Sequence, residues 1–82
     1  MKAEIFVRLK PSVLDPQGKA IENSLKSLGV AGIASVRQGK VFDVELNVAD
    51  EAQAKLVLND ISAKLLANTV IEDFRIDLKN GK

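Results

Sequence analysis

The chain has 82 residues, a formal net charge of +1 and 46% hydrophobic residues, which is typical of one small globular domain, and we expect a single domain over residues 1–82. It contains no Cys and no His, which excludes thiol nucleophiles, disulfides and imidazole acid–base catalysis and argues against an enzyme that works alone. Its 12 basic and 11 acidic residues nearly cancel, which excludes the one-signed field that attracts nucleic acids or anionic membranes.

Residues 2–10 predict a strand with one buried face. Apolar and polar residues alternate along this segment, as they do in a half-buried strand. Pro11 ends the strand, because proline has no N–H to donate to a sheet. The side chains expected to face the core are Ala3, Ile5, Val7 and Leu9.

Residues 16–28 predict the first helix. Asp15 is a good N-cap, Pro16 suits the first helical position, and Gly29 can end the helix in a left-handed conformation. Apolar residues recur at the helical period, so one face of this helix should be buried. The apolar stripe consists of Ile21, Leu25 and Leu28.

The middle of the chain predicts a β-hairpin. Residues 33–37 form a short strand, Gln38 and Gly39 supply the turn with Gly39 at positive φ, and residues 40–48 alternate again. This second strand should have one solvent-exposed face. Its inward side chains are Phe42, Val44, Leu46 and Val48.

A second helix and a last strand complete the pattern. The helix begins after the N-cap Asp50 and runs to about Ala67, and Asn68 can end it in a left-handed conformation. Alternation then predicts a strand over about residues 70–78. The apolar stripe of the helix consists of Ala54, Val57, Leu58, Ile61, Leu65 and Leu66.

The predicted element order is β-α-β-β-α-β, which indicates an α+β fold. Two right-handed crossovers interleave into a four-stranded antiparallel sheet with both helices on one face, the ferredoxin-like arrangement. The core of so small a domain is thin and its edge strands are long, so we expect self-association through the sheet. The mixed charges on the open face of the sheet are also compatible with a solvated surface.

Other functions of this topology find less support in the residues. RNA-recognition domains stack bases on aromatics of the first and third strands; Phe6 fits the first, but Phe42 should point into the core. An acylphosphatase needs a phosphate-cradling loop after the first strand, and a single glycine follows there, at Gly18. A free-standing ferredoxin-like ligand-sensing or RNA-binding module stays open as the alternative function.

Three segments of the chain resemble one known family. They are residues 14–20 (LDPQGKA), 35–40 (SVRQGK) and 65–74 (LLANTVIEDF). In order, spacing and content they resemble PurS, the small subunit of phosphoribosylformylglycinamidine (FGAM) synthase, and the resemblance covers essentially the whole chain. Thr69 departs from the pattern, because the family usually has a proline there that would stiffen the link before the last strand.

The resemblance implies a noncatalytic structural subunit of cytoplasmic FGAM synthase in de novo purine (IMP) biosynthesis. Such a subunit bridges a PurQ-type glutaminase, which releases ammonia from glutamine, and a small PurL-type synthase, which uses ATP and Mg²⁺. We expect no cofactor bound by this chain alone, no nucleic acid or membrane as partner, and a homodimer or a dimer of dimers. The residues agree, since a glutaminase needs a Cys–His pair that this chain lacks.

We therefore expect no catalytic, cofactor-binding or metal-ligating residues, only contacts with partner subunits. Gly18, in the first helical turn, is explained either by close approach of a partner backbone or as a tolerated surface glycine. Arg37 and Lys40 flank an exposed turn and suit an acidic partner surface, a nucleotide or solvent alone. Asn68 suits a helix cap as well as a contact. The interface candidates are Asp15, Pro16, Gln17, Gly18, Arg37, Gly39, Lys40, Asn68, Glu72 and Asp73.

Overall fold

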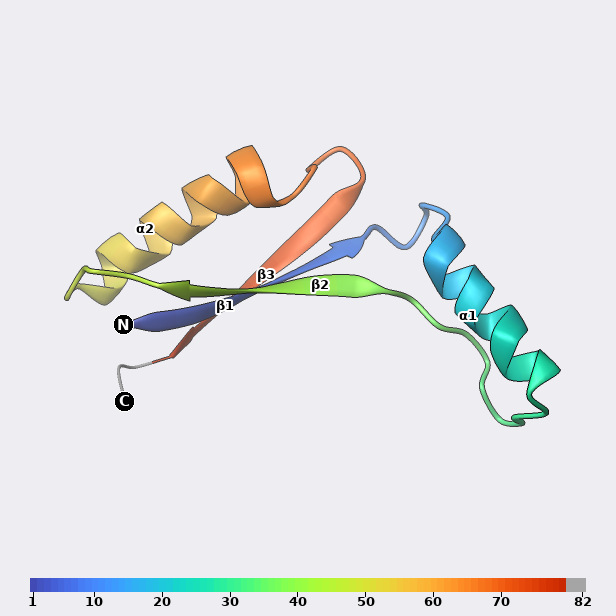
Figure 1. The fold of residues 1–82 in the computed structure, drawn as a ribbon. Coiled ribbons are helices and arrows are strands. Elements are labelled where there is room, and N and C mark those ends of the chain that lie inside the picture. The colour runs from blue at the N-terminus through green and yellow to red at the C-terminus, as the bar shows by residue number, and fades with distance from the viewer. Residues whose placement is uncertain (80–82) are drawn as a thin grey trace.

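The computed structural model describes residues 1–79, which form a small antiparallel sheet and two helices (Figure 1). A π-helical turn, η1, follows the second helix without a break. The elements in chain order are β1 (Lys2–Leu9), α1 (Pro16–Ser27), β2 (Gly39–Glu45), α2 (Glu51–Ile61), η1 (Ser62–Leu66) and β3 (Glu72–Lys79).

The sheet has three strands in the order β2-β1-β3, and both pairings are antiparallel. The central strand β1 places Ile5 opposite Phe42 on one side and opposite Ile76 on the other. Since alternate residues face the same side, most apolar residues of the three strands gather on one face, whereas Phe6 and its partner Val41 lie on the other. The predicted alternation of the first strand, the strand after Gly39 and the last strand is confirmed.

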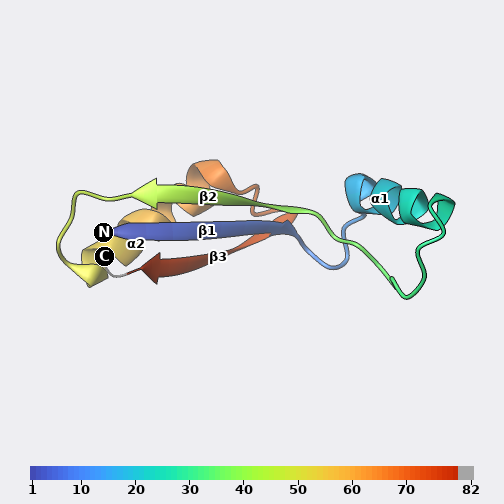
Figure 2. The ribbon, with the colours of Figure 1, turned by 60° about the horizontal axis from the view of Figure 1, so that its bottom comes forward.

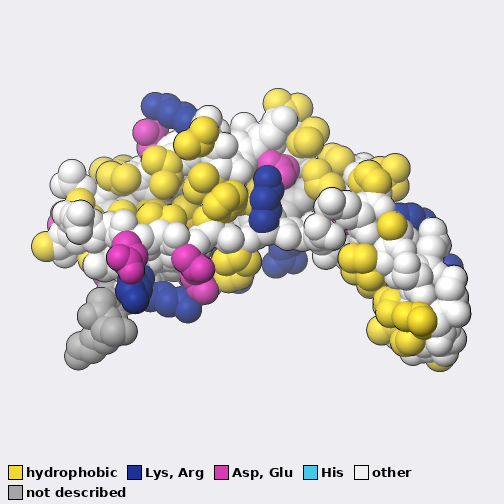
Figure 3. Space-filling view, in the orientation of Figure 1, with side chains coloured by type: hydrophobic (Ala, Val, Ile, Leu, Met, Phe, Trp, Pro, Cys, Tyr) yellow, Lys and Arg dark blue, Asp and Glu magenta, His cyan; other side chains and the backbone are white. Residues whose placement is uncertain are grey.

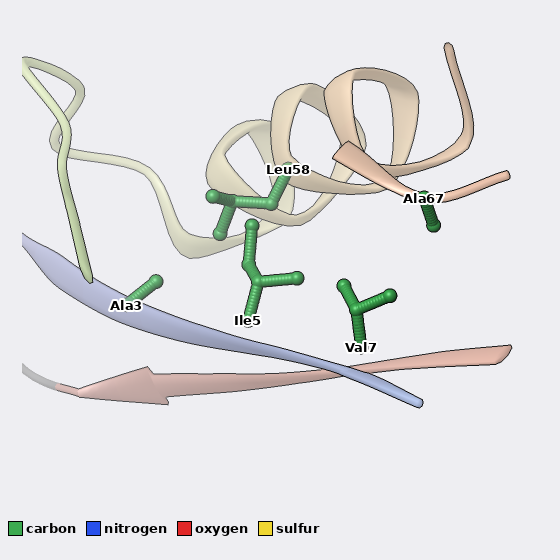
Figure 4. Packing of buried hydrophobic residues seen from close by; sticks show 5 residues of the cluster. All are labelled: Ala3, Ile5, Val7, Leu58 and Ala67. Carbon is green, nitrogen blue, oxygen red and sulfur yellow. The ribbon is translucent and has the colours of Figure 1, made fainter. Parts of the chain in front are cut away.

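The core lies between that face and α2. Ile5 and Leu58 are fully buried, and Ala3, Val7 and Ala67 pack around them (Figure 4). A rim of half-buried apolar side chains from β2 and the residue after it, from β3, and from the ends of α2 and η1 surrounds this cluster. The rim consists of Phe42, Val44, Leu46, Ile61, Leu66, Phe74, Ile76 and Leu78.

The prediction of a fourth strand at residues 33–37 was wrong. These residues run beside α1, beyond the end of the sheet, where no strand edge is available to pair with them (Figures 1 and 2). Glu22 of α1 accepts from Val36 N–H at 2.8 Å, and the cap Asp15 accepts from the adjoining Gln38 N–H at 2.6 Å. The predicted hairpin turn is absent too: Gly39 does not have positive φ but starts β2, opposite Arg8.

The prediction that both helices cover one face of the sheet was also wrong. Only α2 does so, whereas α1 extends away from the sheet (Figures 1 and 2). The radius of gyration is 16.2 Å, against about 12 Å expected for a compact chain of this length. The stripe on α1 therefore lacks a core to enter, and Leu28 is 76% exposed and Ile21 40% exposed.

The predicted helix boundaries are confirmed in most respects. Asp15 and Asp50 are the N-caps, and Gly29 ends α1 with φ +76°. The second helix reaches Leu66 through η1, and Ala67 is already extended. Asn68, in contrast, is not left-handed, since no residue other than glycine has positive φ in the described part of the chain.

Candidate interface site where α1 meets the sheet

The three segments that resemble one family converge at the end of the sheet from which α1 departs. A groove of about 320 Å³ lies there, and we call it the junction groove. Half of the interface candidates border it: Asp15, Gln17, Gly39, Lys40 and Glu72. The other lining residues are Val7, Leu9 and Gln38.

Asp15 ties the start of α1 to the chain that enters β2. Its carboxylate is buried and accepts hydrogen bonds from Gly18 N–H at 2.9 Å and from Gln38 N–H at 2.6 Å. These bonds, with that from Gly18 as the larger cause, hold the pKa of Asp15 below its ordinary value, because they stabilise the charged form. Asp15 is thus both the helix cap and the link between two of the three segments.

Gly18 is explained by this chain's own backbone. A Cβ at Gly18 would lie 2.3 Å from the carbonyl oxygen of Val36 and 2.7 Å from Oδ2 of Asp15. Gly18 is buried, so the interpretation as a tolerated surface glycine is wrong. Close approach of a backbone is the right reason, but that backbone belongs to residue 36 and not to a partner.

Glu22 is a structural residue of this site that sequence reasoning missed. Its side chain accepts from Val36 N–H at 2.8 Å and pairs with Lys19 at 3.5 Å. The bond from Val36 is the main cause that lowers the pKa of Glu22. The spacing of Asp15, Gly18 and Glu22, three and then four residues apart, places them on one helix face and was the available signal.

Glu72 lines the junction groove, and Asn68 lies next to Glu72 outside it. Glu72 accepts from Asn68 N–H at 2.6 Å and lies 3.8 Å from the ammonium of Lys40. The side chain of Asn68 accepts from Val70 N–H at 3.1 Å, so it orders the turn into β3 rather than capping α2. Lys40 is the most exposed charge of this group, with 55% of its side chain accessible.

Besides Gly18 and Asn68, three candidates do not line the junction groove. Pro16 is exposed at the start of α1. Arg37 donates to the carbonyl oxygen of Lys10 at 3.0 Å, and with Asp73 it lines a separate cleft on the other side of the sheet. The alternation of β3 explains the split, because neighbours such as Glu72 and Asp73 point to opposite faces.

The aromatic residues do not form a base-stacking platform. Phe42 packs against the core, as predicted, and the guanidinium of Arg75 lies 4.3 Å from the ring centroid of Phe6. Within residues 1–79 no group of three Asp or Glu side chains could hold a metal ion. No helix in the same range is long and apolar enough to span a membrane.

Comparison with known proteins identifies the family. The PurS model, described as phosphoribosylformylglycinamidine (FGAM) synthase, matches residues 2–80. This chain belongs to the PurS family. A protein of Synechocystis named phosphoribosylformylglycinamidine synthase subunit PurS is 45% identical over 74 residues, which cover 90% of this chain and 74% of the relative.

Solved PurS structures share the fold. PurS of Methanocaldococcus jannaschii, described as one of the subunits of formylglycinamide ribonucleotide amidotransferase in the purine biosynthetic pathway, superposes with a TM-score of 0.89 at 32% identity, covering 99% of this chain and 98% of that one. A chain in the structure of PurLQS from Thermotoga maritima gives 0.85 at 26% identity, with 93% of each covered. The predicted family, and the α+β class with an antiparallel sheet, are confirmed.

Proposed function

We propose that this chain is the structural subunit that bridges a PurQ-type glutaminase and a small PurL-type synthase in FGAM synthase, in the cytoplasm. The observation that carries the proposal is the convergence of the three PurS-like segments, separated in sequence, at the junction groove. The hydrogen bond from Gln38 N–H to Asp15 joins the first two segments, and the ion pair between Lys40 and Glu72 joins the second and third. The Thermotoga maritima relative comes from a structure named PurLQS, which supports a shared assembly.

A bridging subunit contributes geometry to the reaction of its partners. Ammonia released at one site must reach the other before it is protonated or lost, so a fixed orientation of the two sites raises the yield. In this proposal glutamine, ATP and Mg²⁺ act in the partner subunits. The exposed Lys40, backed by Glu72 at 3.8 Å, gives the groove a charged group with which to recognise a partner.

Self-association is part of the proposal, as a homodimer or a dimer of dimers. Both outer strands of the sheet, β2 and β3, have one unpaired edge, and α1 exposes its apolar stripe to solvent (Figure 3). A second copy that pairs with the sheet and covers α1 would supply hydrogen-bond partners for a strand edge and would bury the apolar stripe. Light scattering should give at least twice 8.9 kDa, and Leu28→Glu should lower that mass while Asn23→Glu, on the same helix, should not. A monomer at all concentrations would contradict this part.

Reconstitution tests the bridging role. Glutamine-dependent FGAM formation by the glutaminase and synthase should rise sharply when this chain is added. Lys40→Glu should weaken assembly about tenfold, or about 1.4 kcal/mol, because it places a second acid beside Glu72. Lys55→Glu on α2 is the matched control and should assemble normally. A rate that does not change on addition of the chain would refute the proposal.

A further inference from the structure

All three arginines of the chain line one cleft. Arg8, Arg37 and Arg75 are far apart in the sequence, and they are the only arginines present. They meet in a cleft of about 540 Å³ on the face of the sheet opposite α2, which we call the arginine cleft. None of the lysines in the described chain lines it. Its other lining residues are Phe6, Leu9, Pro11, Gln38, Asp73 and Phe74.

Two of the guanidinium groups are held in place. Arg75 stacks over Phe6, its direct partner across β1 and β3, with 4.3 Å from the guanidinium carbon to the ring centroid. Arg37 reaches from the segment before β2 and donates to the carbonyl oxygen of Lys10 at 3.0 Å. Arg75 also lies 3.7 Å from a carboxylate oxygen of Asp77, through one of its terminal nitrogens. The other N–H donors of Arg75, and those of Arg37 beyond its one hydrogen bond, are available to a ligand.

The third guanidinium has its donors uncommitted within residues 1–79. Arg8 is exposed and makes none of the hydrogen bonds or ion pairs between described side chains. Asp73 lies opposite it across β1 and β3 and supplies the only carboxylate of the cleft. The positive groups therefore outnumber the negative one by three to one.

Arginine in place of lysine indicates which ligand suits the cleft. A guanidinium presents parallel N–H donors that match the paired oxygens of a phosphate, whereas an ammonium acts as a point charge. A volume of about 540 Å³ falls within the range of small-molecule sites, and the apolar wall of Phe6, Leu9 and Pro11 suits a flat or apolar part of the ligand.

We propose that the arginine cleft binds a phosphate-bearing small molecule of nucleotide size through Arg8, Arg37 and Arg75. In this proposal the ligand carries a diphosphate, which occupies the space between the three guanidinium groups. Asp73 limits the total positive charge of the cleft. This ligand site goes beyond the bridging role and departs from the expectation that the chain binds no cofactor by itself. Bridging does not require it, so either idea can fail without the other.

Direct titration of the isolated full chain tests the site. Each arginine gives one side-chain Nε–Hε signal in a nitrogen-15 correlation spectrum, so three signals report on three residues. ADP and pyrophosphate, added at an ionic strength of about 0.15 M to screen weak surface attraction, should move all three with one dissociation constant. Inorganic phosphate should bind more weakly, because it engages fewer guanidiniums.

Variants separate recognition from charge. Arg8→Gln should weaken ADP and pyrophosphate binding at least tenfold, the loss expected for a hydrogen-bonded charged pair. Arg8→Lys should weaken binding severalfold, because lysine keeps the positive charge but lacks the parallel N–H donors of the guanidinium. Lys2→Gln removes the same charge from the same strand and the same face, and should bind as the unaltered chain does.

Three results would overturn the proposal. The first is the absence of saturable shifts at millimolar ADP or pyrophosphate. The second is an equal loss of binding in Lys2→Gln and Arg8→Gln, which would mean general charge attraction. The third is malonate binding as tightly as pyrophosphate, which would mean that the cleft selects carboxylates. The fold of a variant is retained if its spectrum without ligand matches that of the unaltered chain at all residues away from the substitution.

Discussion

The sheet half of the molecule and the α1 arm (residues 10–38) are stabilised in different ways. Both contain a helix with an apolar stripe on one face. The helix α1 has 12 residues and α2 has 11. Ala54 and Leu58 of the α2 stripe are fully buried and Ile61 and Leu66 partly so, and hydrophobic burial therefore stabilises that half. The prediction was wrong for Val57 and Leu65, which are 40% and 80% exposed. The stripe of α1 is largely exposed, and the arm is held at its base by hydrogen bonds to Asp15 and Glu22. Similar helices can therefore depend on quite different forces.

The largest expected difference between the two halves concerns their leucines. Leu58→Ala should lower the free energy of unfolding by about 2–5 kcal/mol, because it opens a cavity in the core. Leu28→Ala should change it by no more than about 0.5 kcal/mol at low protein concentration, because Leu28 is 76% exposed. Urea unfolding of both variants measures the contrast. Equal losses at every concentration would mean that the stripe of α1 is buried within a single chain.

Gly18→Ala tests the close approach at the base of the arm. Helix propensity alone would favour alanine by about 1 kcal/mol. The new Cβ would meet the carbonyl oxygen of Val36 at 2.3 Å, so we expect a net loss of about 1–3 kcal/mol in arm stability, measured by hydrogen exchange of the Val36 amide. Asn23→Ala, at an exposed position on the same helix, is the control and should leave that exchange unchanged. A more stable Gly18→Ala variant would contradict the packing described here.

Acid should loosen the arm before it affects the core. The hydrogen bonds to Asp15 lower its pKa from the ordinary value of 3.8, so the folded state favours the charged carboxylate. The resulting stability is present above pH 3.8 and is lost as the pH falls through the lower, folded-state pKa. Glu22 shifts in the same direction.

Hydrogen exchange at Gln38 and Val36, measured as a function of pH, checks this. Protection of both amides should fall on acidification while that of Ile5 persists. Asp15→Asn should weaken the protection of Gln38 at neutral pH and remove the part of its pH dependence that is due to Asp15. If the unaltered chain and Asp15→Asn show the same acid profile at Gln38, the carboxylate does not hold the arm.

The smallest expected effect belongs to the sheet half. Thr69→Pro restores the residue usual in the family and should stabilise the chain by about 0.4–1 kcal/mol, because proline restricts the unfolded chain. No backbone hydrogen bond of the turn uses the N–H of Thr69, so none is lost. Thermal unfolding measures the gain, and Thr69→Ala is the control that should show none. A destabilised proline variant would mean that the turn excludes the angle proline requires.

Much of the fold could be predicted because its signals are local. Alternation identified β1, β2 and β3, and the residues Asp15, Gly29 and Asp50 marked helix ends to within a residue. The prediction of a fourth strand failed because residues 33–37 have a strand-like composition but no neighbouring strand edge with which to pair. The position of Gly39 failed for a related reason: its Cβ would lie 2.8 Å from the carbonyl oxygen of Val7, a constraint from sheet packing and not from a turn.

The candidate site could be predicted only in part. Five of the ten interface candidates from the three family-like segments border one groove. Arg37 and Asp73 lie on a different surface. Nothing in the sequence indicated that Arg8, Arg37 and Arg75 line one cleft. Glu22 was missed because its partner Val36 is 14 residues away and is reached only when the chain folds back beside α1.

The sequence by itself determined the three strands of the sheet, the starts of both helices and the end of α1, and its family-like segments determined the family. These follow from short-range rules, since caps, turns and alternation involve residues within about one helical turn of each other. Only the tertiary structure decided that α1 extends from the sheet and that the arginines converge. An apolar stripe specifies that a face should be buried, but the burial partner depends on contacts between residues distant in sequence.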